Sequence, residues 1–250
     1  GDRDRTLLRN VAYAGALTAL LQIDQQLIEG MLNEKYGRKK ALLDANHRAI
    51  RLGYDYAREH FDCPLPFHCA PMDGTRDSIL MDGNAACALG ALYAGATVGA
   101  WYPITPSTSL MESFKAFCQE YRVDKKTGLK RFCILQAEDE LSAAGMVLGA
   151  GWMGARAFTC TSGPGISLMQ EFLGLAYYTE LPGVFFNVQR AGPATGMPTR
   201  TQQADLMLMA YASHGDTKHI MLFPADPGEA FELSVAAFDI TERFQTPVFV

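Results

Sequence analysis

The sequence predicts an α/β fold in which a parallel sheet is flanked by helices, preceded by a separate helical segment. From about residue 82 onward, short apolar runs alternate with helical patterns, which is typical of a parallel sheet covered on both faces. Residues 2–62 instead carry helical periodicity with no strand between the helices. With 250 residues, 48% of them hydrophobic, the chain can bury a sizeable core.

The helical segment reads as three helices. Apolar residues recur at helical spacing from Leu7 to Leu21, and a second amphipathic run extends to Tyr36 from Asp24, which can cap it. Gly37 can end that second helix. The third run, Lys39–His60, is expected to place these apolar residues on one side: Leu42, Leu43, Ala49, Ile50, Leu52 and Tyr56.

A linker follows the helical segment. The stretch Cys63–Asp82 contains three prolines and Gly74, and proline removes a backbone donor and disfavours helix in the residue before it. We therefore expect a helical domain over residues 1–62, a linker over 63–81 and an α/β domain over 82–250.

The elements of the α/β domain alternate at a regular rhythm. Helices are expected near 84–97, 107–122, 140–153, 165–179, 202–212 and 227–242. Strands are expected near 98–102, 131–135, 156–161, 184–188 and 219–223, with a last one opening at Pro247. The sequence stops at Val250 in mid-strand, so we expect a truncated chain whose helical start is the tail of another domain.

Composition and charge disfavour several classes of function. The net charge is -5 without a long basic cluster, which leaves no electrostatic footprint for nucleic acid. The six cysteines form no CxxC pair, which argues against zinc, an iron-sulfur cluster bound by this chain alone and a disulfide framework. Cys133 and Cys160 lie in apolar strand-like runs and are expected to be reduced core thiols. No secretory signal opens the chain, so we expect it in the cytoplasm.

One uncharged stretch, Gly83–Met111, is long enough to cross a bilayer. Small residues dominate it, and Pro103 and Pro106 interrupt it. We therefore expect a buried helix, a short strand and a turn, with no membrane span.

Four loops follow predicted strands, and the carboxyl ends of parallel strands meet at one edge of a sheet. The loops are Tyr102–Pro106, Gln136–Glu140, Thr161–Gly165 and Arg190–Thr201. Open α/β sheets bind small molecules at this edge, so the convergence of the four loops predicts a ligand site there.

Glu138, at the exit of a strand, is the candidate acid/base or hydrogen-bonding group. A carboxylate that is partly withdrawn from water can share a proton with a ring nitrogen. The alternative is an acid that stabilises a helix N-terminus through the helix dipole, which fits Asp139 and Glu140 as well as it fits Glu138. Spacing alone leaves both interpretations open.

Arg190 enters a loop of Gly, Pro and Thr, where its planar fork can face a carboxylate held by hydroxyls such as that of Thr199. A solvated arginine on a surface loop is an equally good interpretation. The Thr161–Gly165 run, TSGPG, offers backbone N–H groups to an anion at a helix start, although a tight strand-to-helix turn is the favoured interpretation.

Four motifs stand in order along the chain: YPITPSTSLMESF, QAEDELSAAGMVLGAGWMGARAFTCTSGPGISLMQE, VQRAGPATGMPTRTQQADL and YASHGD. Together they resemble the alpha subunit of 2-oxoacid:ferredoxin oxidoreductases, most closely the 2-oxoglutarate type, over about residues 82–250. Residues 1–62, with NVAYAGALTALLQI and NHRAIRLGYDYA, are similar to the end of the gamma domain that many members fuse ahead of alpha.

The resemblance implies a thiamine diphosphate enzyme that oxidatively decarboxylates a 2-oxoacid, passes electrons to ferredoxin and transfers the acyl group to coenzyme A. This chain would supply the pyrimidine-binding domain. Glu138 would be the catalytic residue and would hydrogen-bond the aminopyrimidine ring, with Pro103 and Thr105 also at the cofactor. Thr105, Arg190 and Thr199 would bind the keto-acid groups of the substrate.

The family's GDG motif, which holds the diphosphate and magnesium, is absent from the sequence. The resemblance therefore implies that Mg²⁺ and a [4Fe-4S] cluster lie on a beta subunit, in an (alpha-beta)2 assembly that is active only when complete. Pyruvate is the alternative to 2-oxoglutarate as substrate, and a non-catalytic partner-binding subunit of the same fold is the alternative function. An ordinary nucleotide-binding domain is disfavoured, because no GxGxxG opens a helix after the first strand.

Overall fold

The computed structural model describes the backbone of residues 2–250 and the side chains from residue 8 onward. The chain divides into two compact units, one ending at Ile79 and the other extending from Leu80 to Val250.

The first unit contains the three predicted helices, α1 (Asp2–Leu20), α2 (Gln25–Tyr36) and α3 (Lys40–His60). As expected, Asp24 caps α2, and its Oδ1 accepts a hydrogen bond of 2.9 Å from the Gln26 N–H. Gly37 follows the last residue of α2 in a right-handed conformation, with φ at -53°. The helix therefore ends there without the left-handed turn for which glycine is usually selected.

Helices α1 and α3 cross at two glycines. A Cβ added to Gly15 would lie 2.1 Å from the Ile50 carbonyl oxygen, and one added to Gly53 would lie 1.7 Å from that of Ala12. Because the backbones touch here, small residues fill the contact and the larger apolar residues are left outside it. The predicted apolar face of α3 is therefore partly wrong: Ala49 and Ile50 are buried, whereas Leu42, Leu52 and Tyr56 are exposed. The side chain of Leu7 lies outside the described side chains.

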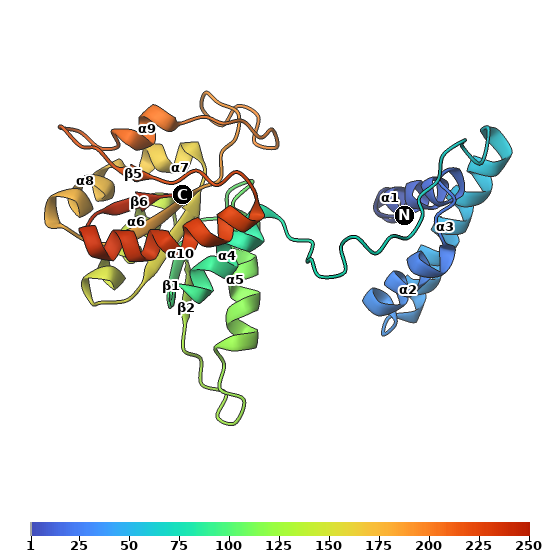
Figure 1. Cartoon of the computed structure of the whole chain (residues 1–250), viewed down its shortest axis with the longest axis horizontal. Helices are drawn as coiled ribbons and strands as arrows, with labels where there is room; N and C mark the ends of the chain where they lie inside the picture. Colours follow the sequence, from blue (N-terminus) through green and yellow to red (C-terminus); the bar gives the residue numbers. More distant parts are fainter. Residues whose placement is uncertain (1) are drawn as a thin grey trace. The chain divides into compact units, whose positions relative to one another are not determined.

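The second unit is a six-stranded sheet covered by helices (Figure 1). Its strands are β1 (Val98–Trp101), β2 (Cys133–Gln136), β3 (Ala157–Thr161), β4 (Gly183–Asn187), β5 (Ile220–Met221) and β6 (Pro247–Phe249). Its helices are α4 (Gly83–Tyr93), α5 (Thr108–Tyr121), α6 (Glu140–Trp152), α7 (Gly163–Leu168), α8 (Gln170–Thr179), α9 (Leu206–Ala210) and α10 (Pro227–Phe244).

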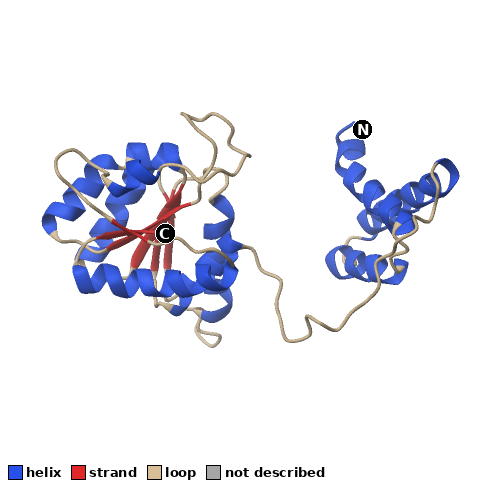
Figure 2. Cartoon of the chain, turned by 45° about the horizontal axis from the view of Figure 1, so that its top comes forward, coloured by secondary structure: helices blue, strands red, loops and turns tan. Residues whose placement is uncertain are grey.

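All strand pairs are parallel, in the order β2-β1-β3-β4-β6-β5. Helices α4, α5 and α10 cover one face of the sheet, and α6 and α8 cover the other, so that the strands lie between two helical layers (Figure 2). The predicted parallel α/β fold is therefore confirmed. The chain passes from β1 to β2 on one side and then returns to place β3 on the other side, which creates a topological switch point between β1 and β3.

The centre of the sheet is fully buried. Every residue of β3 and β4 is buried, as expected for strands covered on both faces. Phe158 makes edge-to-face contacts with Phe114, Phe186 and Phe238, at centroid distances of 4.8, 5.5 and 6.2 Å. The uncharged stretch Gly83–Met111 contributes α4, β1 and the start of α5 to this core, as predicted. The described helices include none that combines the length and the apolar character needed to cross a bilayer.

Several element boundaries differ from the predictions. The helix expected over 165–179 is two helices, because the chain turns at Met169, whose side chain enters the core. The helix expected over 202–212 shrinks to α9, because Asp205 before it is left-handed. The helix expected over 84–97 ends at Tyr93, and Gly95, with φ at +83°, makes the turn into β1.

The two cysteines expected in the core behave differently. Cys160 is buried in β3, and burial raises the pKa of its thiol to about 12. The prediction for Cys133 is wrong: it is exposed, because β2 is an edge strand and its residues are covered less than those of the central strands.

Candidate active site

The exits of β1 and β2 are held side by side at the carboxyl edge of the sheet. Trp101 pairs with Gln136 in the last register of the two strands, and the Ala137 N–H donates to the Trp101 carbonyl at 2.8 Å. Glu138 therefore follows directly from the strand that neighbours the one carrying the YPITP loop. This edge lies beside the switch point, where ligands bind in open α/β sheets.

The three consecutive acids after β2 have different surroundings. Asp139 is the cap of α6: its Oδ1 accepts from the Ser142 N–H at 2.6 Å, and this bond lowers the pKa of its carboxyl group. Glu140 is buried, and its Cγ would lie 2.8 Å from a Cβ added to Gly165. Glu138 caps no helix and is exposed. The helix-start role thus belongs to Asp139, which leaves the Glu138 carboxylate free for a ligand.

The exposure of Glu138 is itself a correction. We expected a carboxylate partly withdrawn from water, but within this chain Glu138 leaves an edge strand and no described element covers it.

Pro103 and Thr105 of the YPITP loop are exposed, and the end of the loop is held by hydrogen bonds from Asn84. The Asn84 Nδ2 atom donates to the Pro106 carbonyl at 2.9 Å and to the Ser109 hydroxyl at 2.7 Å. This anchor was not predicted from the sequence, because Asn84 and Pro106 are 22 positions apart.

Arg190 is joined to the YPITP loop. Its guanidinium is buried, with 4% of the residue exposed, and Nη1 donates to the Thr105 carbonyl at 2.7 Å. Nε and Nη2, the two donors of one edge of the fork, are buried without a hydrogen-bond partner. The interpretation of Arg190 as a solvated loop residue is therefore wrong, and the free edge has the geometry that carboxylates bind in a bidentate manner.

The loop after Arg190 closes on itself. The Ala191 N–H donates to the Arg200 carbonyl at 2.8 Å, which brings the far end of the loop back to its start. Thr199, next to Arg200, is exposed, and no described hydrogen bond involves its hydroxyl. The structure thus brings Arg190 and Thr105 together, whereas no described hydrogen bond joins Thr199 to either of them.

The TSGPG turn between β3 and α7 is filled by neighbouring side chains. A Cβ added to Gly165 would lie 1.9 Å from the Thr161 hydroxyl, and one added to Gly163 would lie 2.4 Å from Asp205 Oδ2. The favoured interpretation as a tight turn is confirmed, because both glycines are required by packing. The carboxylate beside Gly163 disfavours the alternative, an anion site.

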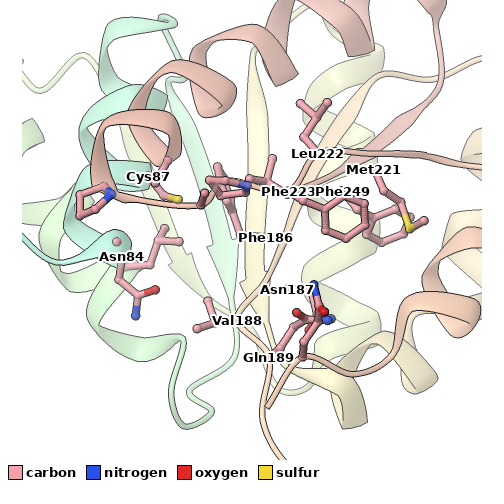
Figure 3. Close-up of a pocket in the computed structure, with 18 of the residues that line it drawn as sticks. Asn84, Cys87, Phe186, Asn187, Val188, Gln189, Met221, Leu222, Phe223 and Phe249 are labelled. Atoms are coloured by element: carbon pink, nitrogen blue, oxygen red, sulfur yellow. The ribbon is translucent and has the colours of Figure 1, made fainter. Parts of the chain in front are cut away.

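A cavity of about 410 Å³ lies along the carboxyl ends of β4, β5 and β6. Figure 3 shows Asn187 and Gln189 together on one side of it, and Asn84 and Cys87 from α4 on the other. The Asn187 amide oxygen is buried without a partner, whereas its Nδ2 atom lies 3.2 Å from the Met209 sulfur. Most of the other lining residues are apolar. The cavity was not predicted, because its walls come from elements distant in sequence.

The parallel sheet, with a free carboxylate and a buried arginine at its carboxyl edge, defines the second unit as a ligand-binding α/β domain. A family model described as pyruvate flavodoxin/ferredoxin oxidoreductase, thiamine diphosphate-binding, matches residues 89–250. The chain therefore belongs to this family.

Relatives of the chain carry matching names. It is 36% identical over 244 residues to the alpha subunit of 2-oxoacid:ferredoxin oxidoreductase 1 of Aeropyrum pernix, covering 96% of this chain and 37% of that protein. It is 45% identical over 170 residues to the 2-oxoglutarate synthase subunit KorA of Methanocaldococcus jannaschii, covering 68% of this chain and 44% of that protein. The chain thus spans less than half the length of these relatives.

A solved structure supports the same family. The 2-oxoglutarate:ferredoxin oxidoreductase of Magnetococcus marinus, determined with 2-oxoglutarate, coenzyme A and succinyl-CoA bound, superimposes with a TM-score of 0.79 at 34% identity. The match covers 96% of this chain and 41% of that one.

Proposed function

We propose that the chain is part of the alpha subunit, with the end of a fused gamma domain, of a 2-oxoacid:ferredoxin oxidoreductase. In this proposal 2-oxoglutarate is converted to succinyl-CoA and CO₂, and ferredoxin accepts the electrons. Residues 1–62 would be the end of the gamma domain, 63–81 the linker and 82–250 the pyrimidine-binding domain. The names of the relatives support 2-oxoglutarate over pyruvate.

The observation that carries this proposal is the pairing of Arg190 with the YPITP loop. The guanidinium is fixed by Thr105 through one nitrogen and keeps two buried donors free. Buried guanidinium donors without a hydrogen-bond partner are energetically unfavourable, and a carboxylate ligand satisfies Nε and Nη2 at once. We infer that this fork binds the carboxylate of the 2-oxoacid, with Thr105 and Thr199 at the keto-acid end.

The residues at the β2 exit fit the aminopyrimidine ring of thiamine diphosphate. When bound, this cofactor supplies an electron sink for the loss of CO₂ from a 2-oxoacid. Because Asp139 satisfies the helix start, the Glu138 carboxylate is free to hydrogen-bond a ring nitrogen and to hold the proton exchanged with it. Pro103 and Thr105 would bound the ring from the neighbouring strand exit.

The metal ion and the iron-sulfur cluster are assigned to a partner subunit. We infer that a beta subunit covers the exposed Glu138 edge and carries Mg²⁺ and the [4Fe-4S] cluster, in an (alpha-beta)2 assembly. Coenzyme A then enters as a cosubstrate of the whole enzyme. The beta subunit would also exclude water from Glu138, which is exposed here because it follows the edge strand β2.

The proposal is tested by co-expressing the intact subunit with its beta partner and measuring coenzyme-A-dependent reduction of a viologen dye with a panel of 2-oxoacids. We expect 2-oxoglutarate to support the highest kcat/KM. A complex that binds thiamine diphosphate and reduces no dye with any 2-oxoacid would contradict the enzyme proposal and favour the non-catalytic partner-binding subunit.

A further inference from the structure

Asp205 has an unusual conformation for its position. It precedes α9 with φ at +65° and ψ at 11°, in the left-handed region that favours glycine. Residues at the start of a helix usually use such a carboxylate as a cap, but the Asp205 side chain makes no capping bond. A capping bond therefore does not explain the left-handed backbone of Asp205.

The Asp205 carboxylate points at the TSGPG turn. Its Oδ2 is buried without a hydrogen-bond partner, and a Cβ added to Gly163 would lie 2.4 Å from it. Only glycine at position 163 leaves the carboxylate in this place.

Asp205 and Arg190 line the same cavity. The cavity has a volume of about 80 Å³, and of its lining residues only Arg190 and Asp205 are ionisable. The rest of the lining consists of Gly163, Pro164, Ser167, Ala191, Gly192, Pro193 and Ala194. Two oppositely charged residues, both with unpartnered buried polar atoms, thus line one small cavity.

The chain also ties together the segments that carry the two groups. The Gln189 side-chain amide donates to the Ala204 carbonyl, so the neighbour of Arg190 is bonded to the neighbour of Asp205. The distance between the segments is therefore fixed by a contact that involves neither charge.

We propose that Asp205 is a positioning residue for Arg190. Its carboxylate balances the buried guanidinium across the shared cavity and keeps Arg190 on the Thr105 carbonyl, ready for the carboxylate of a 2-oxoacid. Without this charge, the guanidinium gains by moving toward water through the exposed residues 192–200. Substrate binding must then bury it again. The inference rests on the proposed role of Arg190.

Glycine is the decisive substitution at position 205, because it suits the left-handed backbone and removes the side chain with its carboxylate. In the assembled enzyme, Asp205→Gly should raise the KM for 2-oxoglutarate about tenfold, with kcat changed less than threefold. The dissociation constant of oxalate, measured by calorimetry without turnover, should rise by a similar factor. A residue that merely shapes the turn predicts unchanged or tighter binding with glycine, and this result would overturn the proposal.

A double-mutant cycle tests the path of the effect. Gly163→Ala displaces the carboxylate without changing any charge, so it should also raise the KM. In the Asp205→Gly background the added methyl group has room, so the double variant should bind substrate as the Asp205→Gly variant does. Additive losses would show that the two positions act separately and would overturn the proposal.

Three further variants make the outcome decisive. Asp205→Asn tolerates the left-handed backbone and removes only the charge, so its KM should rise about fivefold even if the glycine variant folds poorly. Asp216→Gly, an exposed acid in a turn, should leave KM unchanged. If Arg190→Ala leaves oxalate binding intact, the proposed role of Arg190 fails. If only the Asp205 variants leave it intact, the present inference alone fails.

Discussion

Replacing Arg190 tests the carboxylate-binding fork directly. The guanidinium uses Nη1 on the Thr105 carbonyl and has Nε and Nη2 free for the substrate. A hydrogen bond to a charged group contributes about 1.5–3 kcal/mol, so losing two such bonds with partial compensation costs about 3 kcal/mol of binding. Because about 1.4 kcal/mol corresponds to a tenfold change in affinity, Arg190→Ala should raise the KM for 2-oxoglutarate about 150-fold.

Lysine separates charge from geometry at the same position. Arg190→Lys keeps the positive charge but places all donors on one compact ammonium nitrogen in place of the planar fork, so the KM should rise about tenfold. For Arg190→Ala, the free energy of unfolding should change by less than about 1 kcal/mol, because the loss of the Thr105 bond is offset by the removal of the unpartnered buried donors.

Steady-state dye reduction by the assembled enzyme gives both KM values, and Arg200→Lys is the matched control, since Arg200 is an exposed arginine of the same loop. KM values for Arg190→Lys and Arg190→Ala within twofold of that of the unmodified enzyme would show that Arg190 does not bind the substrate carboxylate.

The remaining predictions concern stability. Asp139→Ala removes the α6 cap and should lower the free energy of unfolding by about 1 kcal/mol in denaturant titrations, and an unchanged midpoint would contradict the capping role. Gly53→Val should separate α1 from α3 and expose the first unit to limited proteolysis, whereas Gly30→Val, with nothing within 4 Å of its added Cβ, should not. Burial lowers the pKa of His219 below its ordinary 6.5. Its contribution to stability is therefore present above pH 6.5 and lost as the pH falls through the lowered value. His219→Gln should flatten the acid side of the unfolding profile, and an unchanged profile would contradict this assignment.

The fold was predictable because its signals are local. Continuous apolar runs such as those of β3 and β4 identify buried parallel strands, and the alternation with helical patterns identifies the layers. The boundaries were less predictable where tertiary contacts decide them. The residues before α9 read as helix formers, yet Asp205 adopts a left-handed conformation that brings its carboxylate to Gly163.

The candidate site was only partly predictable for the same reason. Spacing could not separate Glu138 from Asp139, because both follow a strand and precede a helix, and only the bond from Ser142 assigns the cap. The contact between Arg190 and Thr105 joins residues 85 positions apart. Sequence patterns report local geometry, so they indicated candidate loops and could not show which side chains are anchored and which are free.

If the strand-exit carboxylate of Glu138 acts on the cofactor, its loss must lower the kcat of the Glu138→Gln variant in the assembled enzyme. General acid-base catalysis contributes typically about 10²–10⁴-fold, so kcat should fall at least about 100-fold while thiamine diphosphate stoichiometry and unfolding midpoint stay unchanged. Asp139→Asn, one residue along, should keep kcat within about threefold, because asparagine also caps helices. A kcat for Glu138→Gln within threefold of the unmodified enzyme would contradict the account.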